Sequence, residues 1–312
     1  MEVYLGLDGL PDGMVNPVVT IGAFDGIHRG HQQLLGRVNA RAKEIGGTGV
    51  LVTFEPHPQR VIAPGTAPPL LTSREEKIPL LESTGLNALV ILPFNRKLSE
   101  MEAEDFVIDI LKGAIGVRLL VLGHDHAFGK GRRGRPELLR QMAPEHGFDL
   151  EVVEAVRDNG NPITSTLIRN LLREGAVEKA GNLLGRPYDM RGLVEKGEQR
   201  GREIGWPTAN IALPLPEKCL PGDGIYAVHT IVRDRVYAGA CSVGVRPTFG
   251  TGSRTIEVHI LDFDEDIYGE SVEVRFHRRI RDERAFDGVE SLVKQIERDV
   301  AETRSILEQE EH

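Results

Sequence analysis

The chain has 312 residues, a formal net charge of −9 at pH 7, and a composition with 40% hydrophobic and 27% charged residues. This length is about twice that of a typical domain, so we expect two domains, each with its own core. The acidic balance argues against general nucleic-acid binding, and no run approaches the roughly 18 consecutive apolar residues of a membrane span.

The start of the chain and its cysteines bear on the cellular compartment. Residues 1–8 lack the basic start and apolar run of a secretory signal, so we do not expect export. The two cysteines, Cys219 and Cys241, have a spacing that suggests neither a zinc site nor a redox pair. These features predict a cytoplasmic protein in a reducing environment.

The first half alternates short β-branched runs with amphipathic segments. We expect strands at 18–21, 50–54, 88–92, 119–122 and 150–153, and helices at 31–45, 77–84, 103–111, 136–142 and 165–174. Alternation of this kind is typical of an α/β domain with a Rossmann-like parallel sheet.

The second half has a different pattern. Short strands are expected at 190–195, 209–212, 224–231, 235–243, 255–261 and 272–281, separated by Gly, Pro and Asp rather than by helices. This predicts a six-stranded antiparallel β-barrel. Apolar residues from Phe286 to Val300 then recur at steps of three and four, which predicts a terminal α-helix. We place the domains at 1–184 and 185–312.

The segment 18–31 predicts a first phosphate site. An apolar strand leads into a glycine-bearing turn and then into His28 and His31, which would share one face of a new helix, with Gly30 between them. A helix N-terminus attracts phosphate groups. The two histidines can donate hydrogen bonds or positive charge to oxygens during attack at phosphorus.

A second group of polar residues follows at 163–169. The hydroxyls of Ser165 and Thr166, at the start of a helix, and the guanidinium of Arg169 suit phosphate binding. The alternative is a simple helix cap followed by a surface arginine.

Two other features of the first half have open interpretations. His57 lies between two prolines in a loop after a strand, where either ligand contact or a structural role is expected. A basic loop is either a phosphate-facing segment or a solvated one, and consists of Lys130, Arg132, Arg133 and Arg135.

The segment 192–211 predicts a second phosphate site. Three glycines could expose backbone N–H groups to phosphates, and a nearby arginine adds charge; these are Gly197, Gly201, Gly205 and Arg202. Thr208 and Asn210 would point the same way on an extended chain. Their oxygens are suitable ligands for Mg²⁺ bound to ATP phosphates.

The acidic residues Asp262, Asp264, Asp266 and Glu273 imitate the spacing of a calcium loop. Ile267 occupies the position where such loops need glycine. We therefore expect these carboxylates to cap a polar hairpin between two strands.

The first half resembles a known family. Residues 22–31 are similar to the signature of the HxGH nucleotidylyltransferases, and the Phe-Asp-Gly form at 24–26 resembles bacterial FAD synthetases. Segments 51–58, 123–134 and 163–169 fit that family in the same order. The resemblance implies nucleotide contacts from Gly22, Phe24, Asp25 and Asp125. His126 departs from the pattern, because the family usually has an apolar aromatic residue there.

The second half resembles riboflavin kinases. Residues 201–210 are similar to their Gly-Arg-x-Leu-Gly-x-Pro-Thr-Ala-Asn signature, with Ile204 in place of Leu, and segments 221–227, 242–250 and 256–263 follow the same family. Ser242 replaces a common Asn. The resemblance marks Glu257 as the general base that takes the proton from the ribityl 5′-hydroxyl.

The two resemblances together imply a bifunctional enzyme that phosphorylates riboflavin to FMN and adenylylates FMN to FAD. Its expected ligands are riboflavin, FMN, FAD and ATP with Mg²⁺, without a permanently bound cofactor, and it is expected to be a monomer or weak homo-oligomer. One alternative is an HxGH adenylyltransferase for another phosphorylated metabolite. Another is a flavin-binding regulatory protein that has lost one activity.

Overall fold

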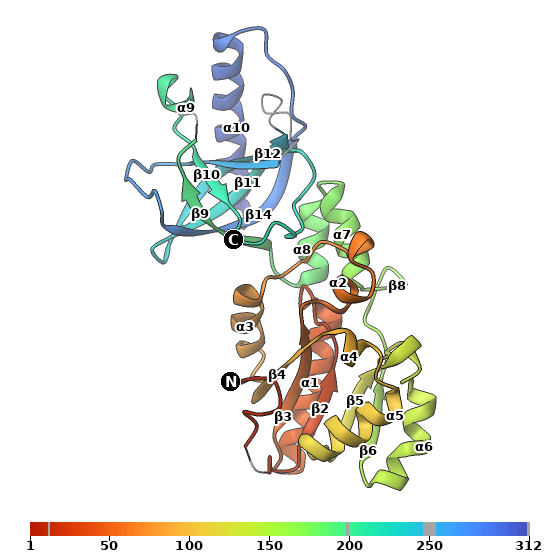
Figure 1. Cartoon of the computed structure of the whole chain (residues 1–312). Helices are drawn as coiled ribbons and strands as arrows, with labels where there is room; N and C mark the ends of the chain where they lie inside the picture. The colour runs from red at the N-terminus through yellow and green to blue at the C-terminus, as the bar shows by residue number, and fades with distance from the viewer. Residues whose placement is uncertain (12, 198–199, 246–253, 311–312) are drawn as a thin grey trace. The chain divides into compact units, whose positions relative to one another are not determined.

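The computed structural model describes residues 1–11, 13–197, 200–245 and 254–310. The chain forms two compact units (Figure 1). The first unit comprises Met1–Pro68 and Lys77–Thr164, and the second comprises Pro69–Glu76 and Ser165–His312. A short stretch of the first half of the sequence therefore belongs structurally to the second unit.

The first unit is built on a six-stranded sheet in which all neighbouring strands are parallel. The strand order is β1-β4-β3-β2-β5-β6. The strands are β1 (Glu2–Leu5), β2 (Val18–Ile21), β3 (Gly49–Glu55), β4 (Ala88–Pro93), β5 (Leu119–Gly123) and β6 (Asp149–Val153). The predicted α/β architecture is confirmed.

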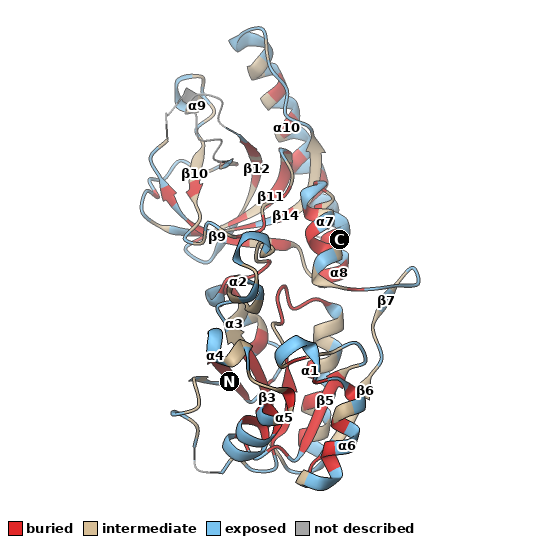
Figure 2. Cartoon of the chain, turned by 45° about the vertical axis from the view of Figure 1, so that its right-hand side comes forward, coloured by how far each residue is buried: buried red, intermediate tan, exposed pale blue. Residues whose placement is uncertain are grey.

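Helices cover both faces of this sheet because its strands are apolar on both sides. Val18 packs in one cluster with Leu35 of α1 (Arg29–Glu44). The next strand residue, Val19, packs on the opposite face in a cluster with Phe106 of the π-helical segment η2 (Phe106–Ala114) and Leu139 of α6 (Pro136–His146). Figure 2 shows the strands buried between these helices.

Several elements of the structure were not predicted. They are the edge strand β1, the hairpin β7 (Arg157–Asp158) and β8 (Asn161–Pro162), the helix α8 (Val177–Leu184) and the short helices α2 (Pro58–Ile62), η1 (Pro64–Thr66), α4 (Arg96–Ser99), η3 (Lys130–Arg132) and α9 (Arg200–Glu203). The helix predicted at 103–111 corresponds to α5 (Ala103–Asp105) followed by η2. Most are too short to show a periodic pattern. Strand β1 is largely exposed and so lacks the apolar run of the central strands.

The second unit contains a closed barrel in which all neighbouring strands are antiparallel, in the order β10-β13-β12-β11-β14-β9. The strands are β9 (Tyr188–Glu195), β10 (Ala209–Ala212), β11 (Gly224–Val232), β12 (Arg235–Val245), β13 (Arg254–Ile260) and β14 (Ser271–Arg281). The terminal helix α10 (Val289–Glu310) packs through Ile306 and Leu307 on Ala227 and Ala238. The predicted six-stranded barrel and terminal helix are confirmed.

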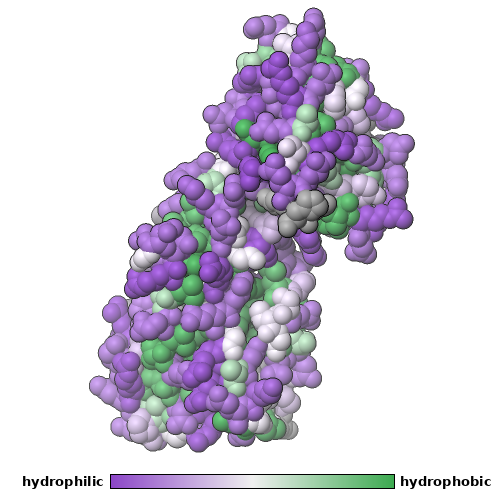
Figure 3. All heavy atoms as spheres, turned by 180° about the vertical axis from the view of Figure 1, so that it is seen from behind, coloured by the Kyte–Doolittle hydropathy of each residue, from purple (hydrophilic) through white to green (hydrophobic). Residues whose placement is uncertain are grey.

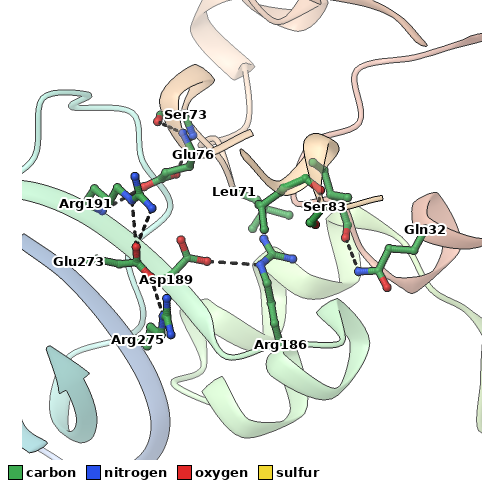
Figure 4. A network of polar contacts seen from close by, with 12 residues as sticks. Gln32, Leu71, Ser73, Glu76, Ser83, Arg186, Asp189, Arg191, Glu273 and Arg275 are labelled. Carbon is green, nitrogen blue, oxygen red and sulfur yellow. Dashed lines mark hydrogen bonds and ion pairs between the residues drawn. The ribbon is translucent and has the colours of Figure 1, made fainter. Parts of the chain in front are cut away.

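The segment Pro69–Glu76 is joined to the second unit by backbone and side-chain contacts. Leu70 forms a parallel bridge with Lys218. The ammonium of Lys218 and the carboxylate of Glu76 form an ion pair whose side chains are only 2% and 3% exposed. Glu76 also accepts hydrogen bonds from the N–H groups of Ser73 and Arg191, at 2.8 and 3.1 Å (Figure 4). Its carboxylate is therefore fully engaged.

The face seen in Figure 3 is mainly hydrophilic. Apolar side chains are instead concentrated in the sheet and barrel cores. Among the residues that the structure describes, no helix is long and apolar enough to cross a membrane.

Candidate active sites

The first candidate site lies where the strand order of the parallel sheet reverses. Strand β2 pairs with both β3 and β5, and the chain proceeds from β2 outward in one direction and from β5 in the other. Open α/β sheets bind ligands at this switch point, at the carboxyl ends of the strands. The turn after Ile21 and the loop after Gly123 both begin there.

The turn between β2 and α1 has an uncommon backbone. Phe24 and Ile27 have φ angles of 47° and 42°, and Gly26 lies between them at 86°. Non-glycine residues in this region cost of order 1–3 kcal/mol and persist where the surrounding structure holds them. Phe24 and Ile27 are 3% and 2% exposed, so burial of their side chains offsets this cost.

His28 and His31 meet at the start of α1, as predicted. Their rings are stacked, with centroids 3.7 Å apart, and the ring of Phe24 stacks on His31 at 4.6 Å. His28 caps the helix, because its Nδ1 accepts a hydrogen bond from the N–H of His31 at 3.4 Å. A capping Nδ1 that accepts leaves the ring proton of neutral His28 on Nε2.

The electrostatic environment favours a neutral His31. Burial lowers the pKa of His31 well below its ordinary value, and the neighbouring charges of His28 and Lys77 lower it further. Its Nδ1 is buried and has no hydrogen-bond partner among the described residues. The structure therefore favours hydrogen-bond donation by His31 over donation of positive charge.

Two glycines of the turn are explained by side-chain packing. A Cβ on Gly30 would lie 3.1 Å from Nδ1 of His28 and 3.8 Å from the carbonyl oxygen of Ile163. A Cβ on Gly22 would lie 3.0 Å from the Phe24 ring and 3.8 Å from Cε1 of His126. The signature glycines thus make room for the rings that line the site.

The loop after β5 approaches the same turn through His126. Burial lowers the pKa of His126 to about 4, against an opposing effect of Asp125, and its Nε2 is buried without a hydrogen-bond partner among the described residues. Asp125 itself is exposed. The departure from the family pattern has therefore placed a neutral imidazole with a buried Nε2 beside Gly22.

The polar residues at 165–169 open helix α7 (Ser165–Arg173), which belongs to the second unit. Arg169 is only 6% exposed, and its Nε donates to the carbonyl oxygen of Pro69 at 2.7 Å. It is therefore not the surface arginine of the alternative interpretation. The contribution of Ser165, Thr166 and Arg169 to phosphate binding stays a prediction.

His57 and the basic loop, whose roles the sequence left open, both make contacts in the structure. Nδ1 of His57 caps α2 by accepting from the N–H of Gln59 at 3.3 Å. Lys130 and Arg133 each form an ion pair with Glu102 at 3.3 Å. A structural role is thus visible for His57 and for part of the basic loop.

The second candidate site lies on one face of the barrel wall. Glu257 of β13 pairs with Asn210 of β10 on one side and with Ser242 of β12 on the other. Residues directly opposite each other in a sheet point to the same face. Thr208 lies two residues before Asn210, and its hydroxyl donates to Oε2 of Glu257 at 3.4 Å. The predicted metal ligands Thr208 and Asn210 therefore lie next to the predicted base Glu257.

The glycines before Thr208 also act by making room. A Cβ on Gly197 would lie 2.2 Å from Nδ2 of Asn210, and one on Gly201 would lie 2.3 Å from the carbonyl oxygen of Trp206. Gly205 has a φ of 84°, which glycine adopts without strain. Arg202 is exposed on α9.

A histidine that was not predicted as a site residue lies beside this site. Nδ1 of His259 lies 2.8 Å from the carbonyl oxygen of Pro207, and its ring contacts Trp206 edge-on at 5.1 Å. The carbonyl can only accept, so Nδ1 carries the proton and donates. Because His259 follows Glu257 by two residues on β13, the alternation of a strand was the one signal that could have identified it.

Ser242, the other departure from the family pattern, has a polar partner. Its hydroxyl donates to Oε1 of Glu283 at 3.3 Å, and burial raises the pKa of Glu283. The rest of the segment 242–250 from residue 246 onward lies outside the described residues.

The calcium-loop interpretation is not supported by the contacts of its carboxylates. Asp262 accepts from Arg304 at 2.8 Å, and Asp266 caps a turn by accepting from the N–H of Tyr268 at 3.0 Å. Glu273 is paired with Arg191 and Arg275 (Figure 4). Within the described part of the chain, no group of three or more His, Cys, Asp or Glu side chains could hold a metal ion.

The donors at Thr208 and Asn210 nevertheless fit a nucleotide-bound Mg²⁺. A hydroxyl and an amide oxygen are hard donors, and they share a face with a carboxylate. Mg²⁺ keeps several waters and takes phosphate oxygens as ligands, so few protein donors are needed. These residues suit a metal that arrives with ATP.

The fold and the two sites define a nucleotidylyltransferase-type α/β unit followed by a barrel with the features of a kinase. Comparison with known families agrees. Residues 13–167 match the family model described as FAD synthetase, and residues 184–307 match that of riboflavin kinase.

Relatives match along the whole chain. A bifunctional riboflavin kinase/FMN adenylyltransferase from Pseudomonas fluorescens is 36% identical over 100% of both chains. One from Bacillus subtilis is also 36% identical, over 91% of this chain and 90% of its own. The chain belongs to the bifunctional riboflavin kinase/FMN adenylyltransferase family.

A solved structure shows the same overall fold. The crystal structure of a Streptococcus pneumoniae protein described as a macrolide-efflux protein has a TM-score of 0.88 and 33% identity, covering 97% of this chain and 99% of that one. The two family models and the curated relatives, rather than that description, indicate the activity of this chain.

Proposed function

We propose that the barrel phosphorylates riboflavin at a site formed by Thr208, Asn210 and Glu257. The observation that carries this proposal is the 3.4 Å contact between Thr208 and Glu257, with Asn210 directly opposite Glu257 across the strand pair. A carboxylate placed beside two neutral oxygen donors can accept a proton while Mg²⁺ holds the phosphates.

In this proposal the ribityl 5′-hydroxyl oxygen attacks the γ-phosphorus of ATP. Glu257 accepts the hydroxyl proton, the bond from the γ-phosphorus to the bridging oxygen breaks, and ADP leaves. Thr208 and Asn210 would hold Mg²⁺, which would supply positive charge to the phosphates. Further phosphate contacts come from Gly197, Gly201, Gly205 and Arg202.

The first unit then transfers the AMP group of ATP to FMN. A phosphate oxygen of FMN attacks the α-phosphorus, and pyrophosphate leaves. His28 and His31 donate hydrogen bonds to the phosphate oxygens at the start of α1, where the helix dipole also favours negative charge. The other proposed nucleotide contacts are Gly22, Phe24, Asp25, Gly30, Asp125, Ser165, Thr166 and Arg169.

The same proposal covers the environment of the enzyme. Mg²⁺ enters with ATP as co-substrate, and no permanently bound cofactor is needed. Both cysteines are buried thiols, which suits the reducing cytoplasm. We propose a monomer or weak homo-oligomer that acts on the small molecules riboflavin, FMN, FAD and ATP, without nucleic-acid or membrane partners.

One assay tests both activities. The protein is incubated with ATP, Mg²⁺ and either riboflavin or FMN, and the flavins are separated by chromatography. We expect FMN and then FAD from riboflavin, and FAD from FMN. FMN without FAD would contradict the adenylyltransferase assignment, and FAD from FMN without any conversion of riboflavin would contradict the kinase assignment.

Two variants assign the activities to their sites. His28→Ala should abolish FAD formation and leave FMN formation intact, whereas Glu257→Ala should do the reverse. Each variant thus carries its own control in the other unit. Loss of both activities in either variant would contradict independent sites.

A further inference from the structure

A half-buried lysine, Lys77, lies next to the turn between β2 and α1. It has no role in the proposed mechanism. Lys77 is on helix α3 (Arg74–Glu82), and its Nζ donates a hydrogen bond to the carbonyl oxygen of Ala23 at 2.8 Å. Ala23 lies between Gly22 and Phe24, inside the signature turn. Lys77 and this turn both belong to the first unit.

The Ala23 carbonyl is held from two directions. Besides Lys77, the hydroxyl of Thr53 on β3 donates to it at 3.3 Å, and Thr53 is only 1% exposed. In a trans peptide the C=O and N–H groups point in opposite directions. Fixing the Ala23 carbonyl therefore also fixes the N–H of Phe24, which points away from Lys77.

This peptide directly precedes the strained part of the turn. Phe24 and Ile27 have positive φ angles, and the turn ends at His28, the cap of α1. A conformation of this kind persists only where contacts over-determine it. The Lys77 hydrogen bond is one such contact, at the end of the turn opposite to the stacked histidines.

The charge of Lys77 is also directed at the site. The carboxylates of Asp25, in the turn, and Glu55, at the end of β3, interact with its ammonium and oppose the lowering of its pKa by burial. The positive charge of this ammonium in turn lowers the pKa of His31. Lys77, Asp25 and Glu55 thus form a cluster of charged side chains. This cluster lies next to the turn where the proposed mechanism places the phosphates.

We propose that Lys77 is a positioning residue for adenylyl transfer: it fixes the Gly22–His28 turn, so that the hydrogen-bond donors of the turn and of His28 and His31 face the polyphosphate in the transition state. The proposal rests on the proposed function of this site. It assigns to Lys77 no contact with substrate.

This role differs from simple support of the fold in its kinetic effect. Donors that are held in place for the transition state lower the barrier to reaction, and their loss reduces kcat more than it raises KM. Lys77→Met keeps most of the side-chain length but removes the hydrogen bond and the charge. Lys77→Arg keeps both.

The test measures both activities of the full-length enzyme with saturating Mg²⁺. For Lys77→Met we expect a fall of about 10–100-fold in kcat for FAD formation from FMN and ATP, with KM for both substrates changed less than threefold. FMN formation from riboflavin should stay unchanged. Lys77→Arg should recover at least a third of the lost rate, and Lys43→Met, an exposed lysine on α1, should leave both activities unchanged.

Three results would overturn the proposal. These are full adenylylation activity in Lys77→Met, an effect confined to KM, or loss of the kinase activity together with FAD formation. Failure of the wild-type enzyme to make FAD from FMN would instead contradict the proposed function itself. The two kinds of failure are therefore distinguishable.

Discussion

Asn210 and Glu257 are direct partners across the β10–β13 pair, so the proposed metal ligand and the proposed base lie on one face of the barrel wall. Neither strand alone provides this arrangement. Antiparallel pairing brings together two residues that are 47 positions apart in the sequence, and Thr208 joins them through its contact with Glu257.

Removal of the Thr208 hydroxyl should weaken Mg²⁺ use by the kinase. We expect Thr208→Val to raise the Mg²⁺ concentration for half-maximal FMN formation by about tenfold, as for the loss of one ligand contributing about 1.4 kcal/mol. Thr208→Ser keeps the hydroxyl and should stay within threefold of the wild type. Equal Mg²⁺ dependence in Thr208→Val and the wild type would remove this residue from the metal site.

His259 should matter for the kinase through the loop that carries Thr208. Its Nδ1 holds the Pro207 carbonyl, and the amide of Asn can donate from a similar position. We expect His259→Leu to lower kcat/KM for ATP in FMN formation by about tenfold, equivalent to about 1.4 kcal/mol, and His259→Asn to retain most of it. FAD formation from FMN is the control, and equal kinetics of the Leu and Asn variants would contradict the hydrogen-bond role.

The sequence was sufficient to predict the architecture because the strands of both units have regular patterns of apolar and polar residues. All strands of the barrel and five of the six strands of the parallel sheet fall where alternation and apolar runs predict them. The exposed edge strand β1 did not show such a pattern. The signature residues His28, His31, Thr208, Asn210 and Glu257 were visible because their spacing is local or matches a family.

The supporting contacts could not be predicted in the same way. Lys77 is 54 residues from Ala23, and Glu76 is 142 residues from Lys218. Such contacts depend on the strand order and on which distant segments pack together. Short-range periodicity in the sequence carries no information about either. The packing role of Gly30 was missed for a different reason. His28 is only two residues away, but the position of its ring beside Gly30 is visible only in the packed structure.

His126 should make the first unit sensitive to acid. Its pKa is lowered to about 4 in the fold, against about 6.5 in an unfolded chain. Between these values the unfolded state binds the proton more readily, so stability falls as pH decreases from about 6.5 towards about 4. From about pH 7.5 to about pH 5 this group should remove about 2 kcal/mol of stability.

Replacement by the aromatic residue usual in the family tests this effect. His126→Phe should lose about 2 kcal/mol less than the wild type between about pH 7.5 and about pH 5, in urea unfolding of the first unit followed by circular dichroism. Trp206, the single tryptophan, lies in the second unit and reports its unfolding separately by fluorescence. An identical pH dependence in the two proteins would show that His126 is freely protonated in the fold.

The buried pair of Glu76 and Lys218 should be a major source of stability for the second unit. Breaking such a pair leaves an uncompensated buried charge and costs about 3–5 kcal/mol. We expect Lys218→Met and Glu76→Gln each to reduce the free energy of unfolding by this amount, measured by Trp206 fluorescence in urea. An exposed pair gives the control: Lys294→Met on α10, which removes an ion pair with side chains 64% and 85% exposed, should cost less than about 1 kcal/mol.

The double variant Glu76→Gln, Lys218→Met distinguishes the energy of the ion pair from the energy of the other contacts that each side chain makes. It contains no unpaired charge, and the amide oxygen introduced at position 76 can still accept from one of the two N–H groups, of Ser73 or of Arg191, that bond to separate oxygens of Glu76. Its cost should therefore be smaller than the sum of the single costs by about 1–3 kcal/mol. Strictly additive costs would mean that the two charges are stabilised independently, for example through the contact of the Lys218 ammonium with the Leu71 carbonyl at 2.8 Å.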